Sequence, residues 1–168
     1  LSDNLPKKFS LEVCVVDDNS TDDTVMLLKE NFSNISVICT NGNNYWAGAM
    51  RHGFMKSWSN DYNGVLVFND DIVLYDHALE ELIATANVKG AFIKGAESTV
   101  VVGSTCESSN PLSITYGGYI RKHNLFKPSL TRLVPNEKIQ LCDTLNMNFA
   151  LINSRCIDEI GFLSCDFQ

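Results

Sequence analysis

Short apolar runs alternate with polar segments over the first 105 residues of the chain. Their length and their content of β-branched residues predict buried strands at 11–16, 35–39, 64–68 and 100–103. Between these runs, apolar residues recur at helical spacing and predict helices that end near Phe32, over 45–58 and over 78–86. This alternation predicts β-α-β units, and therefore a parallel sheet covered by helices.

The second half of the chain has a less regular pattern. We expect a strand with a glycine bend at 115–120, a loop at 125–135 and a strand at 148–153. Helix starts are expected at residues that cap well: Ser20 or Thr21 for the first helix, Asp76 for the third, and Ser154 for a short helix that Gly161 ends.

Composition narrows the class of protein. The chain has 168 residues, of which 45% are hydrophobic, and this suits one domain with a core. The net charge of -7 argues against a nucleic-acid binder, which needs a basic face. No apolar stretch approaches the roughly 18 residues of a membrane span, and no secretory signal is present, so we expect a cytoplasmic protein whose six cysteines are mostly reduced.

Polar clusters follow the first three predicted strands, at 17–20, 41–44 and 69–71. In a parallel sheet these clusters share one edge, where ligands bind. Each also has an ordinary explanation: the first cluster is compatible with a turn and a helix cap, and the second with a plain loop. The predicted site therefore depends on the coincidence of all three.

Asp70 and Asp71 follow a predicted buried strand and precede the apolar run I-V-L. Two adjacent carboxylates in such a place would repel each other and lose hydration, and a divalent cation would remove both costs. Arg51 lies one turn into the second predicted helix, where it can reach a phosphate or stand as a surface residue. The sequence contains no G-x-G-x-x-G, P-loop or G-x-S-x-G motif.

Three motifs carry a resemblance to a known family. V-V-D-D-N-S-T-D-D-T at 15–24, N-N-Y-W-A-G-A-M-R-H-G at 43–53 and V-F-N-D-D-I-V-L at 67–74 resemble the motifs of family 2 glycosyltransferases, with similar spacing. The chain departs from the family at Tyr45, where glycine is usual, and at Arg51, where asparagine is common. The resemblance implies an α/β, GT-A-like fold with a mostly parallel central sheet flanked by helices.

The resemblance also implies roles for single residues. Asp18 would bind the base of a nucleotide-sugar donor, Asp70 its ribose, and Asp71 a divalent metal, Mg or Mn. The residues expected at the nucleotide are Asp17, Asp18, Asn43, Arg51 and Asp70, and those expected near the donor sugar or the acceptor are Asn69, Asp143 and Asn146.

The implied reaction is an inverting, metal-dependent transfer of a sugar to a hydroxyl of a saccharide or lipid-linked acceptor, in cell-surface polysaccharide biosynthesis. The resemblance implies one domain, with a nucleotide-binding half at about 11–105 and an acceptor half at about 106–168. A location in the cytoplasm, peripheral to the inner membrane face, is expected. The family's general base is expected beyond Gln168, because Asp166 comes too early for that motif.

A phosphoacceptor receiver domain is the alternative. Asp17 and Asp18 would then hold Mg, and Asp70 would be the phosphorylated residue. No Thr/Ser and Lys partners follow at later strand ends in the way a receiver needs, and the alanine- and glycine-rich helix start is unexplained.

Overall fold

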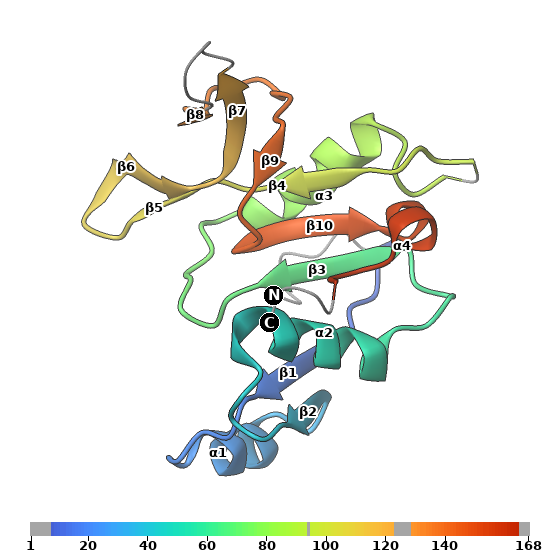
Figure 1. The fold of residues 1–168 in the computed structure, drawn as a ribbon, viewed down its shortest axis with the longest axis vertical. Coiled ribbons are helices and arrows are strands. Elements are labelled where there is room, and N and C mark those ends of the chain that lie inside the picture. The colour runs from blue at the N-terminus through green and yellow to red at the C-terminus, as the bar shows by residue number, and fades with distance from the viewer. Residues whose placement is uncertain (1–7, 94, 123–128, 165–168) are drawn as a thin grey trace. The chain divides into compact units, whose positions relative to one another are not determined.

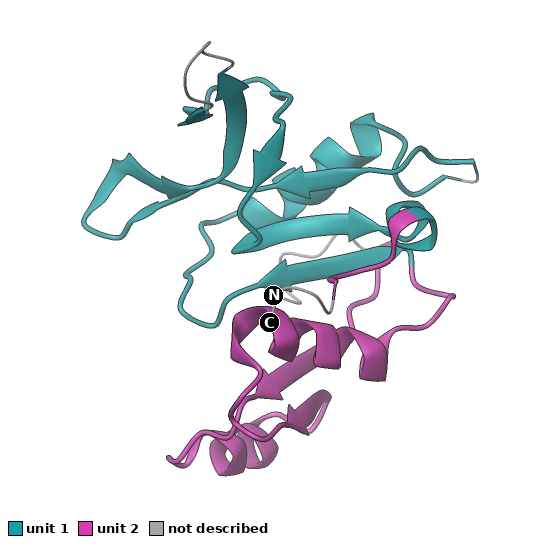
Figure 2. Ribbon diagram, viewed as in Figure 1, with its two compact units in different colours: residues 1, 3–6, 63–159 teal, residues 2, 7–62, 160–168 magenta. Residues whose placement is uncertain are grey.

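The computed structural model describes residues 8–93, 95–122 and 129–164 (Figure 1). They form a mixed α/β structure of four helices and several small sheets. The described residues divide into two compact units (Figure 2): Asn63–Glu159 form unit 1, and residues 8–62 with 160–164 form unit 2. The expectation of a single domain over 1–168 stays a prediction.

Unit 2 contains the expected β-α-β arrangement. Strand β1 (Val13–Asp17) pairs in parallel with β2 (Ile35–Cys39), and Asp17 lies opposite Cys39 at the end of the ladder. Helix α1 (Thr24–Asn31) connects the two strands. Because the pair is parallel, the loops that follow both strands emerge at the same edge.

Helix α2 (Tyr45–Ser57) packs against β1 through its small residues. A Cβ atom at Gly53 would come within 2.5 Å of a methyl carbon of Val16, so only glycine allows this close approach. Gly48, Ala49 and Gly53 are the buried residues of the helix. The small residues of α2 therefore form its packing face against β1.

The expected caps of the first and third helices are wrong. Helix α1 begins at Thr24, and neither Ser20 nor Thr21 caps it; Asp23 takes the N-cap position without a side-chain bond. Helix α3 (Ala78–Val88) has His77, at φ 64°, as its N-cap residue in place of Asp76. In both cases the chain turns later than the first good capping residue.

In unit 1, an antiparallel sheet replaces the expected parallel one. Strand β10 (Phe149–Asn153) lies between β3 (Gly64–Phe68) and β4 (Val100–Val102) and is antiparallel to both. Strands β3 and β4 thus run in the same direction, with α3 between them in the chain, but they do not touch as a ladder. The expectation of a mostly parallel sheet is wrong because a strand from late in the chain occupies the position between them.

The segment after β4 forms small antiparallel sheets. Strand β5 (Thr105–Glu107) pairs with β6 (Asn110–Tyr116), and β7 (Gly118–Lys122) pairs with β8 (Ser129–Arg132) and β9 (Thr144–Leu145). The expected strand at 115–120 is two strands that part at Gly117, where the chain passes from one sheet to the next. The expected loop at 125–135 contains β8, and its residues before 129 lie outside the described ones.

Asn153 organises the core of unit 1. Its side chain is 1% exposed and makes four hydrogen bonds: Nδ2 donates to the carbonyls of Ala91 and Glu97 at 3.0 and 2.9 Å, and Oδ1 accepts from the amides of Thr99 and Cys156, both at 3.0 Å. The last bond caps helix α4 (Ser154–Ile160), so the cap is Asn153 and not the expected Ser154. The expected end of this helix before Gly161, at φ 76°, is confirmed.

We expect the Asn153→Ala variant to lose about 3 kcal/mol of unfolding free energy, because it leaves several buried backbone groups without partners. Chemical denaturation followed by circular dichroism measures this loss. Asn31→Ala, which removes one exposed side-chain bond to the Leu27 carbonyl, is the matched control and should change stability by less than about 0.5 kcal/mol. A loss below about 1 kcal/mol at Asn153 would contradict its assigned role.

Candidate functional site at the strand ends

The first two polar clusters meet at the carboxylate of Asp18, directly after β1. Its Oδ1 accepts hydrogen bonds from the Thr40 hydroxyl at 2.5 Å, the Gly42 amide at 2.9 Å and the Asn44 side-chain amide at 3.0 Å. Its Oδ2 accepts one, from the Asn44 backbone amide at 3.0 Å. The loop after β2 is thus wrapped around one carboxylate that follows β1.

These donors favour the ionised form of the carboxylate. The Thr40 hydroxyl, followed by the Asn44 side chain, lowers the pKa of Asp18 from 3.8 to about 2. Asp18 is therefore an anion over the whole neutral range, although no cation of the described residues pairs with it. A permanently ionised acceptor suits recognition of a ligand N–H group.

Asp17 stabilises the same edge from below the surface. Its side chain is 6% exposed and accepts the Ser20 amide at 3.2 Å, while its carbonyl accepts the Thr40 amide at 2.9 Å. The Thr40 hydroxyl also lies 3.3 Å from that carbonyl. Its burial and its bonds place Asp17 in the support of the loop, beside Asp18, and its expected role at the nucleotide stays a prediction.

The backbone of Tyr45 has the conformation expected of the glycine that is usual at this position of the motif. Its backbone has φ 50°, in the left-handed region that glycine adopts without strain, and the residue is 80% exposed. It opens α2 directly after Asn44. The chain therefore keeps the backbone shape that the glycine of the motif implies and adds an exposed aromatic ring to it.

The remaining expected residues of unit 2 are more open. Asn43 is exposed, and its backbone amide bonds the Asn41 side chain at 3.3 Å, whereas its own side chain has no partner among the described residues. Arg51 is partly exposed and forms no ion pair within the described part of the chain. Both side chains are thus available to a ligand.

Unit 1 contains the third cluster, in the turn after β3. Asp70 and Asp71 are both exposed, and Val73, in the apolar run that follows, is 93% exposed. The argument that burial desolvates these two carboxylates is therefore wrong: β3 itself is mostly half-buried, with Val67 as its buried residue, and the chain leaves the core at Asn69. Their position relative to Asp18 stays a prediction.

Residues from late in the chain approach this turn within unit 1. The Asn69 amide donates to the Asn148 carbonyl at 3.2 Å, which extends the ladder of β3 and β10 by one step. Asp143 lies further along and accepts the Arg121 amide at 2.7 Å. The Oδ1 of Asn146 is buried and has no hydrogen-bond partner among the described residues, which is costly unless something else supplies a donor.

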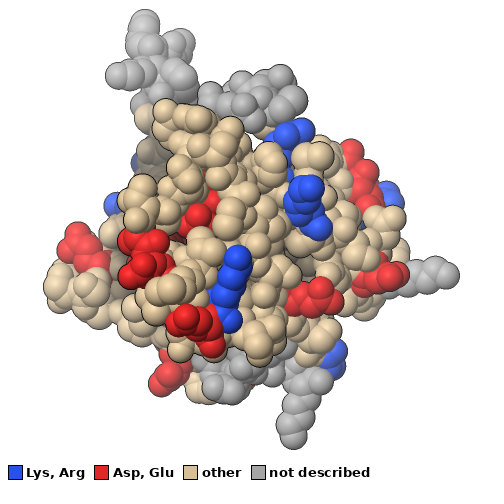
Figure 3. All heavy atoms as spheres, turned by 90° about the horizontal axis from the view of Figure 1, so that it is seen from below, with Lys and Arg blue, Asp and Glu red and all other residues tan. Residues whose placement is uncertain are grey.

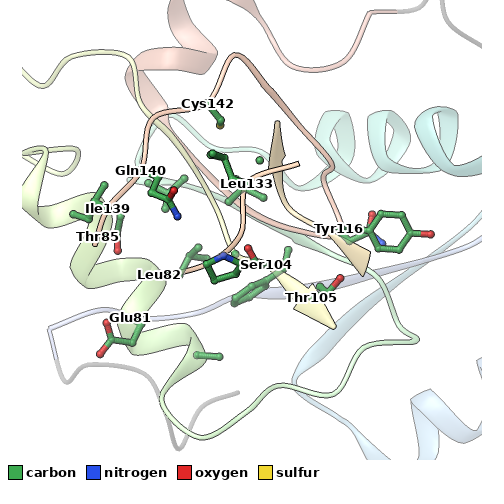
Figure 4. A pocket seen from close by; sticks show the side chains of 18 of the residues that line it. Glu81, Leu82, Thr85, Ser104, Thr105, Tyr116, Leu133, Ile139, Gln140 and Cys142 are labelled. Carbon is green, nitrogen blue, oxygen red and sulfur yellow. The ribbon is translucent and has the colours of Figure 1, made fainter. Parts of the chain in front are cut away.

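A groove of about 1170 Å³ starts beside the turn, with Asp71 and Asn148 among its lining residues. Leu82 and Thr85 of α3 form part of its wall, and Figure 4 shows them around the same hollow as Leu133 and Gln140. The lining mixes apolar side chains with hydroxyl and amide groups. Such a surface suits a ligand with both polar and apolar faces.

The residues after β3 supply some, but not all, of the ligands that a divalent cation needs. No group of three or more His, Cys, Asp or Glu side chains that could form a metal cage occurs among the described residues. Asp70 and Asp71 offer exposed carboxylate oxygens, the ligand type that Mg²⁺ and Mn²⁺ prefer, and Mg²⁺ sites in phosphate-transferring proteins commonly use one or two carboxylates with substrate phosphates and water. The donor set fits a cation held jointly with a ligand.

Comparison with known families decides the class. The model of glycosyl transferase family 2 matches residues 3–138. This chain belongs to glycosyl transferase family 2. Membership implies a nucleotide-sugar donor and an acceptor, and it favours the glycosyltransferase over the receiver domain. No curated protein and no solved structure matched the chain.

Two general properties of the described residues accompany this assignment. None of the helices in the described ranges is long and apolar enough to cross a membrane. On the face drawn in Figure 3, acidic and basic side chains of the described residues are interspersed, and the basic ones form no continuous stripe.

Sequence reasoning missed two residues of this site. Thr40 and Asn44 supply three of the four bonds to Asp18, whereas Asn43 was the residue chosen from that loop. Asn and Thr side chains can donate hydrogen bonds to an acid, and this property was the signal that pointed to both residues. Their partner, Asp18, however lies 22 to 26 positions away in the chain. Only the parallel pairing of β1 with β2 brings them together.

We expect the Thr40→Val variant to raise the pKa of Asp18 above about 2, toward 3.8, because the hydroxyl is the largest cause of the lowered value. Since the pKa of Asp18 is lower in the folded than in the unfolded state, the ionised carboxylate stabilises the fold fully above about pH 4. This contribution disappears as the pH falls through the folded pKa. In the variant it should disappear at a higher pH. Carboxyl-carbon NMR titration measures this shift.

Thr24→Val is the matched control, because the Thr24 hydroxyl lowers the pKa of Asp22 in the same unit. That variant should raise the pKa of Asp22 and leave Asp18 unchanged. An unaltered pKa of Asp18 in Thr40→Val would mean that the short Thr40 bond does not exist in solution.

Proposed function

We propose that this protein transfers a sugar from a nucleoside-diphospho-sugar to an acceptor hydroxyl, with inversion at the anomeric carbon and with a divalent cation. The observation that carries the proposal is the set of four hydrogen bonds to Asp18, through which two of the family-type motifs meet at one ionised carboxylate. The β1–α1–β2 unit and the β3–α3–β4 connection support a GT-A fold, as a single domain, for the whole.

In this proposal unit 2 supplies the residues that bind the base and the diphosphate. Asp18 accepts an N–H of the base, with Asp17 beneath it, and Asn43 supplies a further amide. Arg51 reaches the diphosphate, because its guanidinium has no ion pair in the described chain and phosphate is its best partner. Asp70, from the turn after β3, binds the ribose hydroxyls.

Asp71 would hold the divalent cation, Mg or Mn, together with the donor diphosphate. When bound, the cation supplies positive charge that offsets the charge of the departing nucleoside diphosphate. The protein's own part is to present exposed carboxylate oxygens directly after a strand of the sheet, which fixes where the turn begins while the outer side of the carboxylates stays open.

The sugar and the acceptor would occupy unit 1. Asn69 and Asp143 flank that region, and the buried Oδ1 of Asn146 gains the donor it lacks from a ligand hydroxyl. The groove that Asp71 helps to line has the mixed surface that a saccharide or lipid-linked acceptor needs. The acceptor hydroxyl attacks the anomeric carbon from the side opposite the diphosphate, and a base removes its proton. We assign that base to none of the described residues.

The test is binding of nucleoside diphosphates with Mn²⁺, followed by thermal stabilisation and calorimetry. A ligand that binds only the folded state at 100 times its Kd should stabilise the protein by about 2.7 kcal/mol. We expect Asp71→Asn to abolish the Mn-dependent part of the binding and to leave the melting temperature of the free protein unchanged, because the side chain is exposed.

Asp158→Asn is the matched control, since it removes another exposed carboxylate of unit 1 that lies on α4. It should bind like the unaltered protein. Unchanged affinity and metal dependence in Asp71→Asn would remove Asp71 from the cation site, and the absence of any response to nucleoside diphosphates would overturn the proposed function.

A further inference from the structure

The bonds around Asp18 are distributed unevenly between its two oxygens. Oδ1 accepts three hydrogen bonds, from Thr40, Gly42 and the side chain of Asn44. Oδ2 accepts one, from the Asn44 backbone amide. A carboxylate has about four acceptor positions, two on each oxygen. Oδ1 is therefore filled by the protein, and only Oδ2 has a position left for a ligand.

The supply of acceptor positions decides which nucleobase such a carboxylate can recognise. Guanine presents two neighbouring N–H donors, at N1 and at its amino group, and a carboxylate binds this edge with both oxygens. Uracil and thymine present a single imide N–H. A carboxylate with one open oxygen can satisfy the imide completely, but it leaves one guanine donor without a partner.

The protein fixes this arrangement with two residues of the loop after β2. The Thr40 hydroxyl also lies 3.3 Å from the Asp17 carbonyl, and the Asn44 side chain also donates to the Asn41 side chain at 3.1 Å. Two of the three donors to Oδ1 are thus anchored elsewhere as well, so the carboxylate cannot rotate to offer Oδ1 without breaking several bonds. Thr40 and Asn44 are positioning residues for Asp18.

We infer that Asp18, held by Thr40 and Asn44, selects a donor nucleotide whose base offers one N–H, as uracil and thymine do, and discriminates against guanine. This inference rests on the proposed function, since it assumes that Asp18 contacts the base. It adds the base class and the two residues that set it.

The experiment compares the affinities of UDP and GDP for the unaltered protein with Mn²⁺ present, by calorimetry. We expect UDP to bind at least about tenfold more tightly than GDP, the effect of one unpaired donor in a partly exposed site. UDP methylated at N3, which lacks the imide N–H, should bind at least about tenfold more weakly than UDP.

The Thr40→Val/Asn44→Ala double variant removes two of the three donors to Oδ1 and should narrow the preference for UDP over GDP. Asn31→Ala, on α1, is the control and should keep the preference. Circular dichroism confirms that each variant is folded, and the comparison of the three nucleotides on the unaltered protein tests the inference without any variant.

The possible failures are distinct. If UDP binds but GDP binds equally well or better, or if N3 methylation has no effect, the inference is wrong while the proposed function stands. If no nucleoside diphosphate binds, the proposed function fails and the inference fails with it.

Discussion

The hydrogen bonds accepted by Asp18 are the interaction on which the candidate site depends. A loop rich in Asn and Gly has little apolar surface to bury, so its shape has to come from polar bonds. The Asp18 carboxylate provides these bonds to Thr40, Gly42 and Asn44 at once, and the buried Asp17 next to it holds the start of the loop through its carbonyl. One side chain thereby fixes both the edge of the sheet and the entrance to α2.

Unit 1 solves the same problem with an uncharged residue. Asn153 ends the buried strand β10 and satisfies the backbone of the segment before β4 and the first turn of α4. A neutral amide has both donors and acceptors, so it can be buried completely. The Asp18 carboxylate can only accept hydrogen bonds, and it stays ionised and partly exposed. The difference matches the two positions: Asn153 supports the core, and Asp18 lies at the edge of the sheet, where we propose that the nucleotide binds.

Local pattern predicted the elements of the first half well. The apolar runs at 35–39 and 64–68 became strands with those bounds, and the helix at 45–58 is one residue shorter than expected. Helix starts were predicted less well, because several residues near each start can cap and the turn geometry chooses among them. The later strands were the hardest: β8 lies in a segment interpreted as a loop, and all of its residues are exposed, so no alternation of apolar and polar residues marks it.

The sequence by itself determined the parallel β1–β2 pair, the strands of the first half, and the polar clusters that follow them, because apolar runs and the residues that break them act over a few neighbours. It also carried the family motifs. Only the tertiary structure decided that β10 lies between β3 and β4, that Asp70 and Asp71 are exposed, and that Thr40 and Asn44 complete the Asp18 site. These features join residues far apart in the chain, and their partners follow from strand order and burial, which local composition does not specify.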